Sequence, residues 1–108
     1  MIDEQKIRGL IGLCMRAGKI KTGTDIVEQT VKRGGAHLAL VDAGMAPRGR
    51  KAIADACAYV NCPIAVVPED MLGDAIGKPG RMAACITDAG FAEKLKTYLS
   101  PDGESTID

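Results

Sequence analysis

Two short segments combine cationic side chains with glycine-containing backbone that a phosphate group can approach closely. The first, Lys19 to Thr24 (Lys-Ile-Lys-Thr-Gly-Thr), leads from a predicted strand into the start of a predicted helix. A helix start presents unpaired N–H groups and partial positive charge, which both favour an anion. The second segment, Gly77 to Arg81 (Gly-Lys-Pro-Gly-Arg), places a lysine and an arginine in a predicted turn. Each segment could hold a phosphate, and each is also consistent with a solvent-exposed turn.

Residues that would support catalysis or cofactor binding are missing from the sequence. Neither glycine-containing segment has the spacing of a P-loop or of a dinucleotide-binding fingerprint. The one histidine, His37, begins a predicted strand, and the adjacent acids Glu69 and Asp70 fall at a predicted helix start. We find no Ser-His-Asp order and no cluster with metal-ligand spacing. We therefore expect a protein that is not an enzyme, with no cofactor, no metal and no small-molecule substrate.

Four cysteines, Cys14, Cys57, Cys62 and Cys85, lie in otherwise apolar stretches of the chain. None of their spacings matches the C-x2-C pattern of zinc ribbons or redox motifs. Secreted disulfide scaffolds contain a much higher proportion of cysteine in shorter chains. The cysteines are therefore expected to be small, reduced core residues.

The composition is that of a globular domain. The chain has 108 residues, of which 46% are hydrophobic and 26% charged, values close to globular averages. It lacks an apolar run of the ~20 residues that a membrane span needs, and its acidic first segment differs from a signal peptide. We expect a cytoplasmic protein without membrane contact. Aromatic residues make up only 3%, which argues against a base-stacking platform for single strands.

Charge is distributed unevenly although the whole chain is neutral. Residues 1–51 contain ten basic and five acidic residues, a net charge of +5, and the remaining residues have −5. Such asymmetry is a weak indication of a surface that faces a polyanion. The basic half also supplies weaker candidates for a surrounding positive surface: Lys32, Arg33, Arg48, Arg50 and Lys51.

Hydrophobic periodicity and cap residues predict alternating helices and strands. In chain order they are a helix capped by Asp3 and ended by Gly18, a short strand over 19–22, a helix from Gly23-Thr24 to Gly34-Gly35, a strand over 37–41, a helix from Pro47, a strand over 63–67, a short helix through Met71 to Ile76, a strand over 82–87 and a last helix capped by Asp88. The strands are apolar without alternation, which is typical of strands covered on both faces.

This pattern predicts an α/β fold: a three-layer α/β/α sandwich with a short mixed sheet of about four strands. We expect a single domain over residues 1–100 and a flexible C-terminal tail over 101–108. The order of the strands in the sheet does not follow from the pattern.

Several segments in this order carry a family resemblance. They are LIGLCMRAGKIKTG, TVKRGGAHLALV, Pro47, NCPIAVV, LGDAIGKPGR and ITDAGFAEKL. The chain resembles small bacterial members of the kink-turn-binding ribosomal protein superfamily, whose namesakes are the large-subunit proteins 7Ae and 30e. The resemblance covers roughly Glu4 to Tyr98, and its most specific parts are Leu72-Gly73-x-Ala75-x-Gly77 and the spacing from Gly23 to Gly34.

The resemblance implies a sandwich fold and a non-catalytic role in binding structured RNA, with ribosomal RNA among the candidate partners. In such proteins the RNA lies against the start of the second helix and the loop before the last strand, where its bent shape is recognised. The RNA-contacting residues expected here are Lys19, Lys21, Gly23, Thr24, Asp25, Ile26, Gln29, Gly77, Lys78, Pro79, Gly80 and Arg81.

The sequence departs from the family pattern at three of these positions. Asp25 replaces the usual Asn, Ile26 the usual Glu and Gln29 the usual Lys. Each lost charged or bidentate contact costs on the order of 1–3 kcal/mol of binding free energy. An alternative is therefore a protein-interaction module on the same fold, in which Ile26 beside Met45 or Met82 forms an apolar contact patch. The oligomeric state is not predicted.

Overall fold

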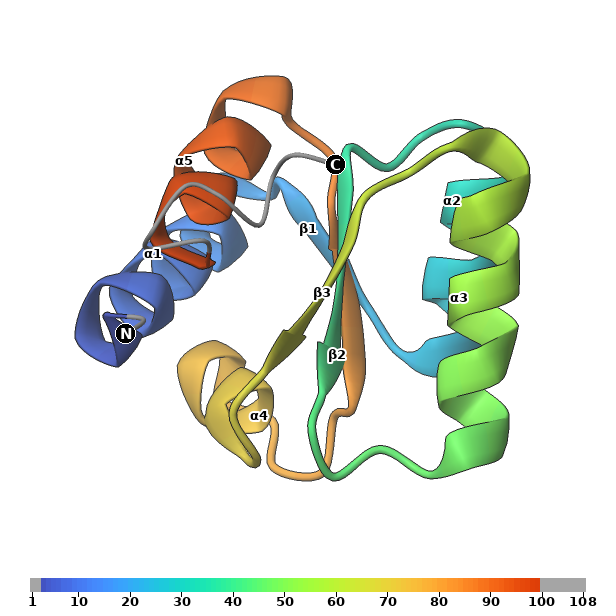
Figure 1. Cartoon of the computed structure of the whole chain (residues 1–108). Helices are drawn as coiled ribbons and strands as arrows, with labels where there is room; N and C mark the ends of the chain where they lie inside the picture. The colour runs from blue at the N-terminus through green and yellow to red at the C-terminus, as the bar shows by residue number, and fades with distance from the viewer. Residues whose placement is uncertain (1–2, 100–108) are drawn as a thin grey trace.

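Helices and strands alternate through residues 3–99, which are the residues described in this computed structural model (Figure 1). The elements are α1 (Glu4–Ala17), β1 (Ile20–Thr22), α2 (Thr24–Lys32), β2 (Leu38–Asp42), α3 (Pro47–Val60), β3 (Ile64–Val67), α4 (Met71–Ile76), β4 (Ala83–Ile86) and α5 (Ala89–Leu99). Every predicted element is present, with small shifts at the boundaries. The predicted tail over 101–108 lies outside the described residues.

The four strands of the described residues form one mixed sheet in the order β1-β4-β2-β3. β2 and β3 run parallel, whereas β4 is antiparallel to both of its neighbours, β1 and β2. Ile86 of β4 is level with Ile20 of β1 on one side and with Leu38 of β2 on the other. The predicted mixed sheet is confirmed, and its last strand in the sequence is central.

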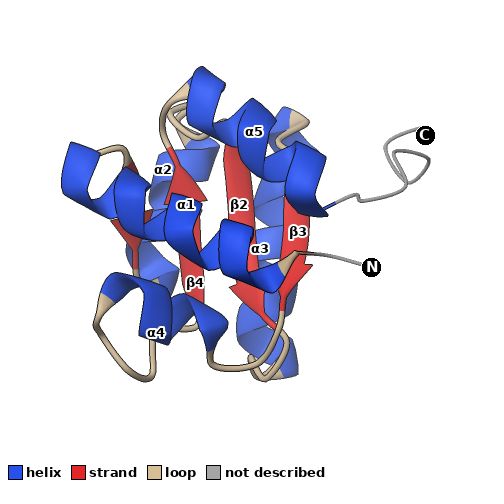
Figure 2. Cartoon of the chain, turned by 90° about the vertical axis from the view of Figure 1, so that its left-hand side faces the viewer, coloured by secondary structure: helices blue, strands red, loops and turns tan. Residues whose placement is uncertain are grey.

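Helices cover both faces of this sheet, as the α/β/α prediction requires. Figure 1 shows α1, α4 and α5 on the left of the sheet and α2 and α3 on the right, and Figure 2 views the first of these layers from the front. Each layer encloses its own apolar cluster. On the α1 side the cluster includes Ile7, Leu10, Ile11 and Cys14 of α1. On the other side Val27 and Val31 of α2 pack against Ile53 of α3.

The helix ends follow local signals in the sequence. The Asp3 carboxylate accepts the N–H of Lys6 at 3.1 Å, and that of Asp88 accepts the N–H of Phe91 at 2.9 Å. These bonds satisfy donors that have no partner within the helix. Gly18 ends α1 at a φ of 71°, a left-handed conformation that glycine adopts without strain. The predicted caps of the first and last helices are confirmed.

The prediction that the strand over 63–67 is covered on both faces is wrong, because β3 lies at the edge of the sheet and is partly exposed. Its one neighbour in the sheet is β2. Val67 is buried, but Ile64 and Val66 are 39% and 50% exposed. Apolar residues without alternation indicate a strand; they do not show how many neighbours it has, since that depends on strand order.

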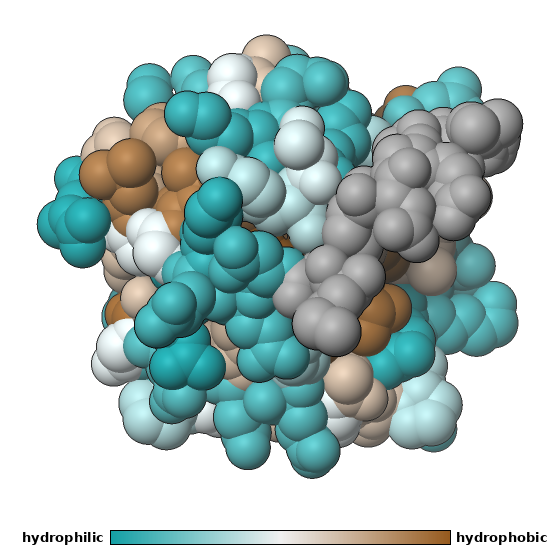
Figure 3. Space-filling view, turned by 60° about the vertical axis from the view of Figure 1, so that its left-hand side comes forward, coloured by the Kyte–Doolittle hydropathy of each residue, from teal (hydrophilic) through white to brown (hydrophobic). Residues whose placement is uncertain are grey.

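The visible surface is mostly hydrophilic on the side of α1, α4 and α5. In Figure 3 the hydrophobic residues on this side form separate patches with polar side chains between them. Within residues 3–99, no helix has both the length and the apolar character that crossing a membrane requires.

Asp42, at the end of β2, joins three separate segments although its side chain is completely buried. One carboxylate oxygen accepts the N–H of Gly44 at 2.7 Å, and the other accepts the N–H of Asp70 at 2.8 Å. The backbone N–H of Asp42 donates to Met82 O at 2.8 Å. Asp42 thereby connects the turn before α3, the start of α4 and the start of β4.

Replacing Asp42 should therefore destabilise the fold. Asp42→Ala leaves two N–H groups without their acceptor, and we expect a loss of about 2–4 kcal/mol in the free energy of unfolding. Asp42→Asn, with one acceptor oxygen, should lose about half as much. Urea denaturation measures both values. Asp55→Ala, at an exposed carboxylate of α3, is the control and should leave the midpoint unchanged; equal midpoints for all variants would contradict the role of Asp42.

Candidate functional site

The two glycine-containing segments predicted from the sequence lie side by side in the fold. β1 and β4 are antiparallel, so the end of β1 lies next to the start of β4. The N–H of Gly23, just after β1, donates to Ala83 O in the first residue of β4 at 3.1 Å. Arg81 Nη1 lies 3.0 Å from the position that a Cβ on Gly23 would take. Sheet pairing thus places the start of α2 against the loop that precedes β4.

The start of α2 is open to solvent. Gly23 has a φ of 101° and provides no capping side chain, and its carbonyl accepts the N–H of Val27 at 2.9 Å. No side chain of the described residues caps this end of the helix. Thr24 is half-buried, while Asp25 and Ile26 are exposed. The first-turn N–H groups and the helix dipole therefore favour an anion at this position.

The α4–β4 loop lies directly on α4, where a glycine permits close contact. A Cβ on Gly73 would be 3.0 Å from Lys78 O and 3.2 Å from Pro79 Cα. The N–H of Lys78 donates to Gly73 O at 2.9 Å. Gly77 and Gly80 have φ values of 73° and 90°, which favour glycine. These contacts and backbone angles determine the path of the loop and thereby the position of its two cations.

A hollow of about 220 Å³ lies between α4 and this loop. Carboxylates are present on its α4 side, and Arg81 belongs to its loop side. It is lined by Asp70, Gly73, Asp74, Pro79, Gly80, Arg81 and Met82. Carboxylates and a guanidinium together make the hollow polar. Its positive charge, that of Arg81, lies at the edge of the hollow that faces Gly23.

The cations of the two segments are available for an external partner. No salt bridge within residues 3–99 involves Lys21, Lys78 or Arg81. Lys21 is exposed in β1, level with Cys85 of β4. A phosphate that approaches these side chains does not have to displace an acidic partner, so little of its attraction is lost.

The weaker candidates on α2 and α3 differ, because most of them interact within the protein. Lys32 pairs with Glu28 at 2.9 Å, and Lys51 pairs with Asp55 at 2.8 Å. The hydrogen bond that Lys51 donates to Asp55, together with the charge of Asp55, raises the pKa of Lys51. Arg50 donates to Ala43 O at 3.0 Å. Lys32 and Lys51 thus pair within their own helices, and Arg50 connects α3 to the turn that precedes it.

The Arg33 guanidinium likewise donates to Gln29 O one turn earlier in the chain, at 3.4 Å. Arg48, in the first turn of α3, has no salt bridge within the described part of the chain. Of the five weaker candidates, Arg48 is thus the one with a charge that no described interaction uses.

Lys19 does not join this group of cations. It precedes β1, and its carbonyl accepts the N–H of Thr87 at 2.9 Å, beyond the far end of β4. The rise of a strand separates Lys19 from Gly23 by about 13 Å. Lys19 was predicted as a site residue because it is close to Gly23 in the sequence. The extended strand between these two residues keeps them apart in the fold.

The apolar patch required by the protein-interaction alternative is smaller than predicted. Ile26 is 51% exposed in the first turn of α2. Met45 is only 8% exposed, packs in the core cluster, and has its methyl group beside Gly49. Met82 is half-buried. Of the two partners expected for Ile26, Met45 is therefore unavailable.

Two residues that support the site were not identified as site residues from the sequence. Gly73 supports the loop, and Asp42 fixes the starts of α4 and β4. A glycine inside a short helix and an aspartate at the end of an apolar run were the available signals. Among the described residues, no group of three or more His, Cys, Asp or Glu side chains is placed to bind a metal.

Sequence comparison places this architecture among known proteins. The sequence profile of the ribosomal protein L7Ae/L30e/S12e/Gadd45 family matches residues 5–96. The chain is 35% identical over 91 residues to RNA-binding protein YlxQ of Bacillus subtilis, covering 83% of this chain and 91% of that protein. It is 33% identical over 98 residues to RNA-binding protein YlxQ of Enterococcus faecium, covering 90% of this chain and 94% of that one.

Solved structures share the fold. A protein of unknown function from Bacillus halodurans superimposes with a TM-score of 0.84 at 33% identity, covering 88% of this chain and 97% of that one. The Giardia lamblia 15.5kD RNA binding protein superimposes with a TM-score of 0.72 at 20% identity, covering 90% and 87%. The second match concerns the fold alone.

Two helix glycines provide a test of how α4 supports the loop. Gly73→Ala should lower the free energy of unfolding by about 1–3 kcal/mol, because its Cβ forces the loop backbone to move. Gly9→Ala is the matched control: a Cβ there meets nothing within 4 Å, so alanine should stabilise α1 by about 0.5–1 kcal/mol. Thermal unfolding measures both. A stabilising Gly73→Ala would show that the loop does not depend on this contact.

Proposed function

The chain belongs to the ribosomal protein L7Ae/L30e/S12e/Gadd45 family, and from this premise we propose that it binds structured RNA and has no catalytic role. The proposed surface consists of the start of α2 and the loop between α4 and β4. The relatives from Bacillus subtilis and Enterococcus faecium, both named as RNA-binding proteins, support the proposal.

The observation that carries this proposal is the junction of an uncapped helix start with cations that have no acidic partner. Gly23 and Arg81 come within contact distance at this junction. A phosphate at the start of α2 would accept backbone N–H groups and lie near the Arg81 guanidinium, which is suited to bidentate phosphate contacts. Lys21 and Lys78 extend the positive surface to either side. Phosphate contacts of this kind supply much of the affinity for nucleic acid.

A bent, kink-turn-like RNA fits this surface better than a straight duplex. The cations come from two separate segments that meet at one point, so they match phosphates that a sharp bend brings together. Asp25 and Gln29, one turn apart on the same side of α2 and both exposed, offer hydrogen-bonding groups to base edges. RNA is commonly recognised through shape and through bases made accessible outside a regular helix. Ribosomal RNA is a candidate partner.

A protein partner at the same surface is the alternative, and the exposure of Ile26 is the observation that favours it. An apolar interface and a phosphate-binding surface respond differently to salt. RNA affinity should fall steeply as the salt concentration rises, because counterions are released on binding. Association through Ile26 should be nearly insensitive to salt.

Substitution of the unpaired cations tests the proposed surface. Lys78→Ala and Arg81→Ala should each weaken binding to a kink-turn RNA about 5–10-fold and reduce the salt slope by about one, since each removes one phosphate contact. Lys51→Ala is the control, because Lys51 pairs with Asp55 on α3; its effect should stay below about twofold. Mobility-shift titrations at several salt concentrations give both quantities.

The same titration on an unbent duplex of equal length tests recognition of shape. The kink-turn RNA should bind about tenfold more tightly or better, because the bend adds contacts that the duplex cannot make. Equal and weak binding to both RNAs, unchanged in the two cation variants, would disprove the proposal. Salt-insensitive binding of a protein that Ile26→Ser abolishes would support the alternative.

Asp25 provides a test in the opposite direction. Its carboxylate lies in the first turn of α2, near the proposed phosphate position, and repels an anion. Asp25→Asn removes this charge and adds an amide donor, so affinity for kink-turn RNA should rise about tenfold. Asp55→Asn is the matched control and should leave affinity unchanged. Weaker binding of Asp25→Asn would indicate that the carboxylate itself accepts hydrogen bonds from the RNA.

A further inference from the structure

Two of the four cysteines meet where α3 ends and β3 begins. Cys57 lies in the last turns of α3, and Asn61 ends the helix in a left-handed conformation with a φ of 59°. This reversal lets the N–H of Cys62 donate to Cys57 O at 2.8 Å. Both side chains pack in the apolar cluster between the sheet and α3. There the two side chains are close enough for each to shift the pKa of the other, and the Cys62 thiol donates to Ala36 O at 3.7 Å and to Pro63 O at 3.4 Å.

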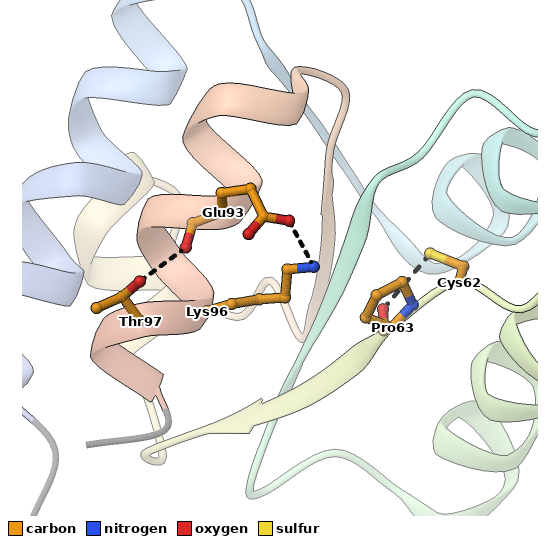
Figure 4. Close-up of polar contacts among 5 residues, drawn as sticks. All are labelled: Cys62, Pro63, Glu93, Lys96 and Thr97. Atoms are coloured by element: carbon orange, nitrogen blue, oxygen red, sulfur yellow. Dashed lines mark hydrogen bonds and ion pairs between the residues drawn. The ribbon is translucent and has the colours of Figure 1, made fainter. Parts of the chain in front are cut away.

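The two sulfurs differ in their access to solvent. Cys57 is 1% exposed, whereas Cys62 is half-buried at the end of the sheet. Figure 4 shows the Cys62 side chain beside Pro63, whose carbonyl lies 3.4 Å from the Cys62 sulfur. A small oxidant can therefore reach Cys62 directly, and Cys57 can react only through its contact with Cys62.

Several neighbours of Cys62 affect the pKa of its thiol. The hydrogen bond from Cys57 lowers the pKa of Cys62, and burial opposes this effect. A backbone hydrogen bond at Ala39 and the charge of Lys96 also lower it. Figure 4 shows Lys96 extending from α5 toward the sheet, where its ammonium group pairs with Glu93 at 2.9 Å. Thiolate character controls the reaction of a cysteine with oxidants.

The other cysteines are poor nucleophiles by comparison. Burial, as the largest cause, raises the pKa of both Cys14 and Cys85 to about 11. The hydrogen bond to Cys62, followed by burial, raises the pKa of Cys57 strongly. Cys62 is also the one cysteine of the four that is not buried, so we expect it to react first with an oxidant.

We propose that Cys57 and Cys62 form a modification site at which a hydroperoxide converts two adjacent thiols to an intramolecular disulfide. In the first step the Cys62 sulfur attacks one oxygen of the hydroperoxide, and the O–O bond breaks. When the oxidant is hydrogen peroxide, Cys62 becomes a sulfenic acid and one water is released. In the second step the Cys57 sulfur attacks the Cys62 sulfur; the S–O bond breaks, and the hydroxyl group leaves with the Cys57 proton as a second water. Two electrons pass from the thiols to the peroxide.

This site lies at the opposite end of the sheet from the proposed RNA surface. Pro63 O accepts the N–H of Ala39 at 2.9 Å, near the start of β2. The start of β2 lies next to the end of β4, because these strands are antiparallel. The RNA surface adjoins the start of β4, at the lower end of the sheet in Figure 1. The oxidation is therefore independent of RNA binding, and it can be tested without RNA.

Trypsin separates the relevant cysteines cleanly. Cys57 and Cys62 share the peptide 52–81, since Lys78 precedes a proline, whereas Cys14 lies in 9–16 and Cys85 in 82–94. The reduced full chain is treated with hydrogen peroxide, and free thiols are alkylated in denaturant. After digestion with trypsin, the masses of the peptides are measured by mass spectrometry. Peptide 52–81 should be lighter by two hydrogens and unalkylated, while 9–16 and 82–94 should remain fully alkylated.

Three variants and an unfolded sample complete the experiment. Cys57→Ser should leave oxidised Cys62 without a partner, so that labelling by dimedone, a sulfenic acid reagent, rises about tenfold. Cys62→Ser should protect the whole peptide, and Cys85→Ser, the matched control, should form the disulfide like the original chain. In urea the reaction should slow about tenfold, because unfolding separates the two sulfurs and removes the hydrogen bond to Cys62.

Three results would overturn the proposal. One is a peptide 52–81 that keeps both thiols at a peroxide concentration that oxidises free glutathione. Another is a disulfide that joins 52–81 to 82–94, which would make Cys85 the partner. The third is equal rates in the folded and unfolded chain, which would mean that the fold contributes nothing.

Discussion

The antiparallel pairing of β1 with β4 is the constraint on which the candidate RNA surface depends. It brings together two segments that are more than fifty residues apart in the sequence, and the hydrogen bond from Gly23 N to Ala83 O marks the point where they meet. Neither segment alone has more than a helix start or a basic turn. Side by side, they combine unpaired N–H groups with cations that lack acidic partners, and this combination attracts phosphate.

The surroundings of this surface restrict its geometry. Gly73 lets the loop lie directly on α4, and the buried Asp42 carboxylate fixes the start of α4 through the N–H of Asp70. Lys78 and Arg81 therefore lie on a loop whose backbone packs on α4 and is hydrogen-bonded to it. A site of this kind loses less entropy on binding than one on an unsupported loop. Stability and binding are thus connected through residues that need not touch RNA.

Local features were predictable, and features that depend on strand order were not. Asp3, Gly18 and Asp88 act within a turn of their own position, so the helix ends followed from the sequence. Lys19 was placed in the site because it is close to Gly23 in the sequence, yet an extended strand carries it to the other end of β1. Ile64 and Val66 resemble buried strand residues, yet β3 has only one neighbour within the sheet.

The sequence by itself determined the alternation of helices and strands, the two segments suited to phosphate, and the cysteines' apolar surroundings. Each of these is encoded by residues within a few positions of one another, through hydrogen bonds, side-chain periodicity and backbone preference. Only the tertiary structure decided which segments meet, which cations lack an acidic partner, and that Cys57 and Cys62 pack in the same cluster with Cys62 the more exposed of the two. These outcomes depend on the pairing of strands and on the reversal of the chain after α3, because contact and burial are properties of the assembled layers.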